Sequence, residues 1–107
     1  MTMTSYRTAY DRILNGMLTM TEASGNAVDG DAAARCIDEA NVFKAELDAL
    51  TAAKLKTSSK DYVALTDTMA RSRQRLEVLS EEIAELVKAV EVAAKVVKVL
   101  AKIIPLL

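Results

Sequence analysis

Apolar side chains recur every three or four residues along most of the chain, the spacing that places them on one face of an α-helix. One such stripe lies within residues 5–23 and a second within residues 31–54, separated by the polar, glycine-containing segment 24–30. The two stripes consist of Tyr6, Tyr10, Ile13, Met17 and Met20, and of Cys36, Ala40, Phe43, Leu47 and Leu50. We therefore expect helices at about 5–23 and 31–54. Gly16 lies inside the first, where an interior glycine costs about 1 kcal/mol relative to alanine, so a kink at this residue is an alternative.

The C-terminal half carries one apolar register from Tyr62 to Ile104, interrupted only by Ser72. Steps of three and four held over this length are typical of helices that pack at a shallow angle in coiled coils and bundles. Ser80 is followed by two glutamates, which is also a typical helix start. The segment therefore predicts either two helices, at about 60–79 and 81–104 with a bend near Ser80, or one straight helix.

The length of the C-terminal segment helps to decide between one straight helix and two helices. A straight helix over residues 60–104 would be about 67 Å long, whereas a compact chain of this length has a radius of gyration near 13 Å. A bend gives four segments of similar length, as a four-helix bundle requires. We predict an all-α fold in a single domain over residues 1–107, an antiparallel bundle of three to four helices. The bent form suits a monomer, and the straight helix becomes competitive in an oligomer.

Composition supports the helical assignment and limits the function classes. Of the 107 residues, 51% are apolar and 27% charged, and three glycines and one proline are too few for a turn-rich all-β chain. The net charge of −1 argues against a general nucleic-acid binder. Arg71, Arg73 and Arg75 form the densest basic cluster, which we interpret as a solvated face with Asp67 and Glu77 nearby. Nucleic acid is therefore not an expected partner.

The sequence offers little chemistry. It contains no histidine and only one cysteine, Cys36, which lies on an apolar stripe, so a buried inert thiol is expected. Residues 29–31 resemble the start of a calcium loop but lack the further ligands. Asp38 and Glu39 are the one carboxylate pair that a helical enzyme could use, and nothing distinguishes them from solvated charges. We expect no catalytic residue, metal or cofactor, and a protein that is not an enzyme.

The C-terminal segment 87–104 is unusually apolar for a surface helix. On a helical wheel its five charges, Lys88, Glu91, Lys95, Lys98 and Lys102, fall within an arc of about 80°, and the rest of the circumference is Val, Ala, Leu or Ile. Three short neighbouring helices would not cover so wide an apolar arc, so part of it is expected to meet another subunit or a partner. The candidate interaction surface is Val87, Val90, Val92, Val96, Val97, Val99, Leu100, Ile103 and Ile104.

These observations predict a non-catalytic interaction or assembly protein that acts through protein–protein contacts of its C-terminal helix, with a protein partner or with itself. The alternative is a membrane-active protein whose C-terminal helix is released from the bundle, its four lysines attracted to anionic headgroups. Spanning a bilayer is disfavoured, because the central charges cost more than the apolar residues return. The first residues lack a signal-peptide pattern, so a cytoplasmic location is the default, with leaderless export left open.

Overall fold

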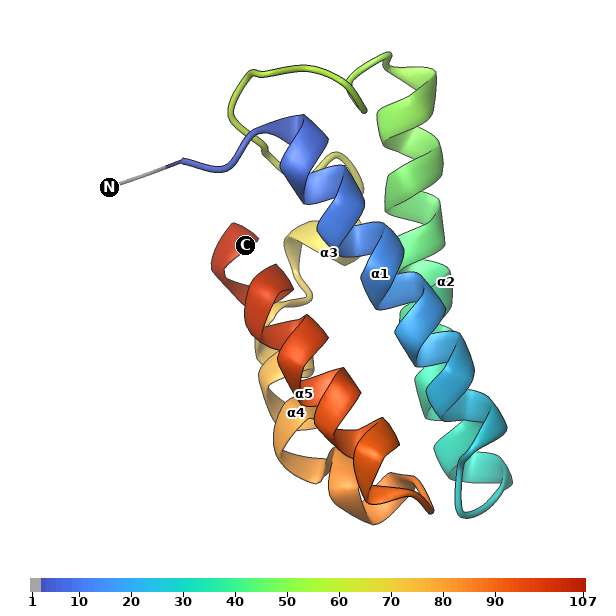
Figure 1. The fold of residues 1–107 in the computed structure, drawn as a ribbon. Coiled ribbons are helices and arrows are strands. Elements are labelled where there is room, and N and C mark those ends of the chain that lie inside the picture. The colour runs from blue at the N-terminus through green and yellow to red at the C-terminus, as the bar shows by residue number, and fades with distance from the viewer. Residues whose placement is uncertain (1–2) are drawn as a thin grey trace.

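The computed structural model describes residues 3–107 and confirms the predicted all-α fold (Figure 1). The helices are α1 (Tyr6–Gly25), α2 (Gly30–Ala52), the single turn α3 (Asp67–Ala70), α4 (Arg73–Leu86) and α5 (Val90–Ile103), and a short 3₁₀ turn follows at Ile104–Leu106. Two antiparallel hairpins, α1–α2 and α4–α5, pack together with α5 against α1 (Figure 1). The radius of gyration is 13.5 Å, as expected for the compact bundle.

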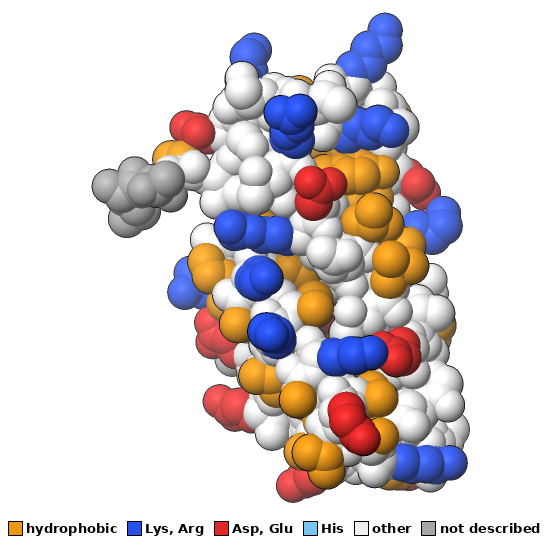
Figure 2. All heavy atoms as spheres, in the orientation of Figure 1, with side chains coloured by type: hydrophobic (Ala, Val, Ile, Leu, Met, Phe, Trp, Pro, Cys, Tyr) orange, Lys and Arg blue, Asp and Glu red, His pale blue; other side chains and the backbone are white. Residues whose placement is uncertain are grey.

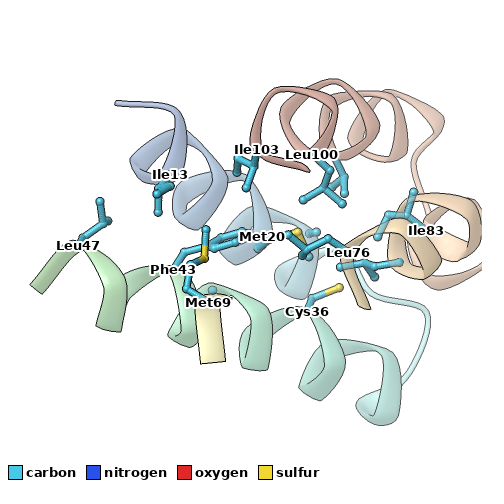
Figure 3. Close-up of a cluster of buried hydrophobic side chains, with 14 of the residues drawn as sticks. Ile13, Met20, Cys36, Phe43, Leu47, Met69, Leu76, Ile83, Leu100 and Ile103 are labelled. Carbon is cyan, nitrogen blue, oxygen red and sulfur yellow. The ribbon is translucent and has the colours of Figure 1, made fainter. Parts of the chain in front are cut away.

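The core lies between the two hairpins. In Figure 3, Phe43 of α2 points into the space between α1, α4 and α5, and Leu100 and Ile103 of α5 approach it from the opposite side. Side chains from all four long helices are fully or almost fully buried there: Ile13, Met20, Cys36, Phe43, Leu50, Leu76, Ile83, Leu100 and Ile103. The two stripes predicted for the N-terminal half supply most of the contribution from α1 and α2.

The predicted helix at 60–79 is wrong over its first half, and the bend predicted near Ser80 lies elsewhere. Residues 60–66 are extended, the chain makes one turn at α3, and α4 begins at Arg73 and continues through Ser80. The chain reverses instead at residues 87–89, between α4 and α5. In both places a side chain distant in sequence takes backbone N–H groups that a continuous helix would need.

Glu46 of α2 is the first of these side chains. Its carboxylate is fully buried and accepts hydrogen bonds from the Tyr62 hydroxyl at 2.7 Å and from the Leu65 and Thr66 backbone N–H groups, each at 2.9 Å. The Thr66 hydroxyl also donates to it at 2.9 Å and in turn accepts the Met69 N–H, which caps α3. A buried charge is tolerated when its hydrogen-bonding capacity is filled in this way. The network therefore holds residues 62–66 extended.

The same connection caps the start of α1. The first N–H groups of a helix have no partner within the helix. Here the Tyr6 N–H donates to the Lys60 carbonyl at 2.9 Å and the Arg7 N–H to the Ser58 carbonyl at 3.1 Å, while the Ser5 hydroxyl accepts the Thr8 N–H. Through these bonds, residues 58–60 hold the connection between α2 and α3 against the start of α1.

Asn26, just after α1, fixes the reversal between α4 and α5. Its side-chain oxygen accepts the Lys88 N–H at 3.1 Å and the Ala89 N–H at 2.8 Å, and the Val28 N–H donates to the Leu86 carbonyl at 2.9 Å. These bonds hold residues 87–89 extended next to the α1–α2 loop. The two inter-helix connections at this end of the bundle are thus joined to each other.

The end of α2 also differs from its predicted end at residue 54. The helix stops at Ala52, and Lys54 adopts a left-handed conformation with φ 59°. The Leu55 N–H then donates to the Leu50 carbonyl at 2.9 Å and the Lys54 N–H to the Thr51 carbonyl at 3.0 Å. This pair of bonds is the Schellman motif, which usually carries glycine where Lys54 stands.

Gly16 causes no break in α1, which is continuous through it. It is buried where α1 crosses α2 and α5. A Cβ atom at this position would lie 2.5 Å from Ile103 Cδ1 and 3.0 Å from Phe43 Cε2. Both of those side chains are fully buried, so neither can move far. Glycine at residue 16 therefore sets how closely α1 approaches its two neighbours.

We expect Gly16→Ala to lower the free energy of unfolding by about 1–2 kcal/mol, because the steric cost exceeds the helix-propensity gain. Gly25→Ala is the matched control, since nothing lies within 4 Å of a Cβ there, and it should be neutral or raise the free energy of unfolding by up to about 1 kcal/mol. Ile103→Val removes the Cδ1 atom that lies closest to the added Cβ. It should therefore lower the free energy of unfolding less in the Gly16→Ala background than in wild type. Urea denaturation measures all four variants, and a Gly16→Ala protein as stable as wild type would contradict the packing account.

The Tyr62 phenol provides a pH-dependent test of the Glu46 network. Burial, then the hydrogen bond to Glu46 and the charge of that carboxylate, raise the pKa of Tyr62 above its ordinary value. The unfolded phenol ionises near pH 10 while the folded phenol keeps its proton. The contribution of Tyr62 to stability is therefore complete below about pH 10 and is lost as the pH rises above it.

We accordingly expect Tyr62→Phe to lower the free energy of unfolding by about 1–2 kcal/mol at pH 7. The difference from wild type should shrink as the pH is raised from about 9 to about 11, because only the wild type loses the phenol's contribution. Denaturation curves recorded across this range measure the difference directly. A gap that stays constant over the range would show that the phenol is not held protonated by its surroundings.

Candidate interaction surface

The structure divides the nine candidate residues of the C-terminal segment into core and surface. Five of them are buried and contribute to the core instead of an accessible surface: Val87, Val92, Val96, Leu100 and Ile103. The physical reason is the place of α5 in the bundle, where it packs against both α1 and α4 (Figure 1). Roughly half of its apolar circumference is thereby covered within one chain.

The remaining four candidates lie at or near the surface. Val90 is 83% exposed and Val97 42% exposed, while Val99 and Ile104 are half-buried. Val90 and Val97 share their face with Ala94 and Ala101, both exposed, and Ile104 continues the row. Together these residues, spaced by four and three, form what we call the α5 ridge: Val90, Ala94, Val97, Ala101 and Ile104. The nine candidates are all Val, Leu or Ile, whereas the α5 ridge also contains two alanines, which the helical wheel places on the same face.

Opposite charges flank the α5 ridge. Lys98 and Lys102 are exposed on the α1 side of α5, where Glu91 lies near the start of the helix, and Glu77 and Glu81 are exposed on α4. Figure 2 shows basic side chains in a column over α5 and acidic side chains along the neighbouring left edge of the molecule. Glu77 pairs with Arg73 at 3.1 Å, whereas neither Glu81 nor Lys98 forms an ion pair with the described part of the chain. The face formed by α4 and α5 thus has an apolar row between an acidic and a basic edge.

The basic cluster of residues 71–75 is divided between different partners. The Arg73–Glu77 contact expected from the sequence is present, but no ion pair joins Arg71 to Asp67 within residues 3–107. Arg75 pairs with Glu39 across the α2–α4 interface, where Arg35 also pairs with Glu82 at 2.5 Å. These two ion pairs connect the hairpins on the side of the bundle away from α1.

The candidate chemical groups of α2 lie apart from one another. Glu39 is buried and engaged by Arg75, while the adjacent Asp38 is exposed on another side of the helix. Cys36 lies fully buried on the apolar stripe, as predicted. Burial raises the pKa of its thiol, which disfavours the reactive thiolate. The Asp38–Glu39 pair does not converge on a common point, and the cysteine is closed off from solvent.

Neither a metal cluster nor a membrane-spanning helix is found among the described residues. Residues 3–107 contain no group of three His, Cys, Asp or Glu side chains placed to hold a metal ion. Within the same residues, no helix has both the length and the apolar character that crossing a bilayer requires. Comparison with protein-family models, with curated proteins and with solved structures finds no match to this chain.

Proposed function

We propose that the protein is a non-catalytic assembly module that pairs with a second copy of itself through its α4–α5 face. The observation that carries this proposal is the exposed α5 ridge between an acidic and a basic edge. Single exposed apolar residues are normal on protein surfaces. A row of five at helical spacing, bordered by charges of opposite sign, instead suits a contact with another helix.

The charge arrangement favours one orientation of the two copies. A two-fold axis parallel to the helices exchanges the left and right edges of the face, so the acidic edge of one copy lies opposite the basic edge of the other. An axis across the helices would place like charges together. We therefore propose that the two copies of α5 run parallel, with Glu81 of each copy opposite Lys98 of the other.

The size of the face limits the strength of this contact. Helices of 14 residues are about 21 Å long, and two adjacent helices are about 20 Å wide, so each copy would bury about 400 Å². Stable complexes bury about 800 Å² per partner. The proposed dimer is therefore weak and reversible, with a dissociation constant in the micromolar range or above.

Membrane engagement by a released α5 has less support. Five of the nine candidate side chains, all of them Val, Leu or Ile, are buried in the bundle, each worth about 1.5–3 kcal/mol. In a membrane these side chains would again be shielded from water, by lipid. The side chains of α1 and α4 on which they pack in the bundle would, however, become exposed to water. The self-association proposal requires no such opening, since the α5 ridge is already accessible.

Sedimentation equilibrium over a range of concentrations tests the proposal. Wild type should show reversible association that Val97→Lys abolishes. Glu81→Lys and Lys98→Glu should each weaken association roughly five- to tenfold at low salt, because the two-fold axis repeats the repulsion at two places. The double variant Glu81→Lys/Lys98→Glu should recover most of the loss, because it restores opposite charges across the interface.

Asp38→Lys is the control, because it makes the same charge reversal as Glu81→Lys at an exposed position on α2. It should leave association unchanged. A wild type that remains monomeric at millimolar concentration would contradict the proposal. Leakage of anionic vesicles caused by wild type and by Val97→Lys alike would contradict it in favour of the membrane-active alternative.

A further inference from the structure

A groove lies on the other flank of α5, where this helix meets α1. Its volume is about 560 Å³, within the range of small-molecule sites in proteins. Arg12 and Leu18 line it from α1, and Lys98, Val99 and Lys102 from α5. The groove lies beside the α5 ridge, with which it shares Ala101 at its border, and Lys98 also lies between the two.

The charge of the groove is predominantly positive. Arg12, Lys98 and Lys102 contribute three cations, against one carboxylate from Asp11. None of the three cations forms an ion pair with a carboxylate of residues 3–107; by contrast, Lys95, on the same helix, pairs with Glu22 at 3.2 Å. Arg12 Nη1 instead donates to the Lys102 carbonyl oxygen at 3.3 Å, which holds its guanidinium across the groove. Such a set of cations favours an anionic ligand.

The rest of the lining is partly apolar. Leu18 is 56% exposed although it is a large aliphatic residue, and Val99 and Pro105 extend the apolar part along the opposite wall. An inorganic anion would use only the cations, and an uncharged apolar molecule would leave them without a partner. A ligand that carries both an anionic group and an aliphatic chain matches both parts of the lining.

We infer that this groove binds a small anionic amphiphile, with its carboxylate or phosphate group on Arg12, Lys98 and Lys102 and its alkyl chain along Leu18 and Val99. The same headgroup chemistry occurs in free amphiphiles and in membrane lipids. The inference does not depend on self-association, because Arg12, Leu18 and Lys102 of the groove lie outside the α5 ridge, which contributes only Ala101 to the lining. Variants at Arg12 and Lys102, which leave Lys98 and Glu81 intact, keep the two proposals experimentally separate.

Amide chemical-shift titrations of the full chain test this inference. Decanoate and decyl phosphate, below their micelle-forming concentrations, should shift the amides of residues 8–19 and 98–104. Inorganic phosphate and decanol each lack one half of the ligand and should bind at least tenfold more weakly. Arg12→Gln/Lys102→Gln should weaken decanoate binding roughly tenfold, a few-fold for each cation.

Arg7→Gln/Lys88→Gln is the matched control, since it removes the same two charges at exposed residues outside the groove, and binding should be unchanged. Leu18→Ser replaces an exposed side chain and should weaken decyl phosphate binding without affecting inorganic phosphate. Decanoate affinity that survives Arg12→Gln/Lys102→Gln, or inorganic phosphate that binds as tightly as decyl phosphate, would overturn the inference. So would binding to phosphatidylglycerol vesicles with no binding of either free amphiphile, because that result would indicate adsorption to a charged surface.

Discussion

The buried carboxylate of Glu46 is the contact on which the rest of this fold depends. Moving a charge out of water costs several kcal/mol unless the protein supplies hydrogen bonds that replace hydration. Here the donors come from Tyr62, Leu65 and Thr66, all on one short extended segment. The carboxylate is therefore stabilised only if that segment leaves the helical conformation and lies across α2. Once it does, the chain is directed into α3 and α4, and residues 58–60 reach the start of α1.

Polar contacts at the two ends of the bundle select among arrangements that the apolar core would allow. The apolar register from Tyr62 to Ile104 is compatible with a straight rod as well as with a hairpin. Asn26 excludes the rod by taking the Lys88 and Ala89 N–H groups, and Glu46 excludes a helix over residues 60–66. The core then stabilises the hairpin thus defined, and Gly16 sets how closely the helices approach.

Sequence patterns predicted those parts of the structure that depend on local spacing. The all-α class and the first two helices follow from apolar periodicity, which reports which face of a helix is buried. The extended segment could not be found this way, because Tyr62, Leu65 and Met69 fit the helical spacing. The side chain that accepts the N–H groups of this segment, Glu46, belongs to another helix. The contact between Asn26 and Lys88 could not be found either, because the two residues are 62 positions apart in the sequence. Ser72, the one exception in the register, is buried and donates its hydroxyl to the Met69 carbonyl. The candidate surface was only partly located, because a helix apolar nearly all round does not reveal which sector its neighbours cover.

The position of α5 gives the molecule two surfaces of different character. Toward α4 it presents the α5 ridge, and toward α1 it forms a groove lined with cations. Both exist only because the chain reverses at residues 87–89 and α5 packs antiparallel to α1. A rod-like C-terminal half would expose the same residues without bringing Arg12 to Lys102 or an acidic edge next to the α5 ridge. Both proposed binding surfaces thus depend on the polar contacts that Glu46 and Asn26 make at the two ends of the bundle.

Amide hydrogen exchange in Glu46→Gln tests the central role of the carboxylate most directly. The amide group is similar in size but replaces one acceptor oxygen with a donor that faces other donors. The account predicts that the Leu65 and Thr66 amides are protected in wild type almost as well as core amides. In the variant they should exchange at least a hundredfold faster, whereas Asp48→Asn, an exposed change on the same helix, should leave them protected. Unchanged protection of these two amides in Glu46→Gln would contradict the account.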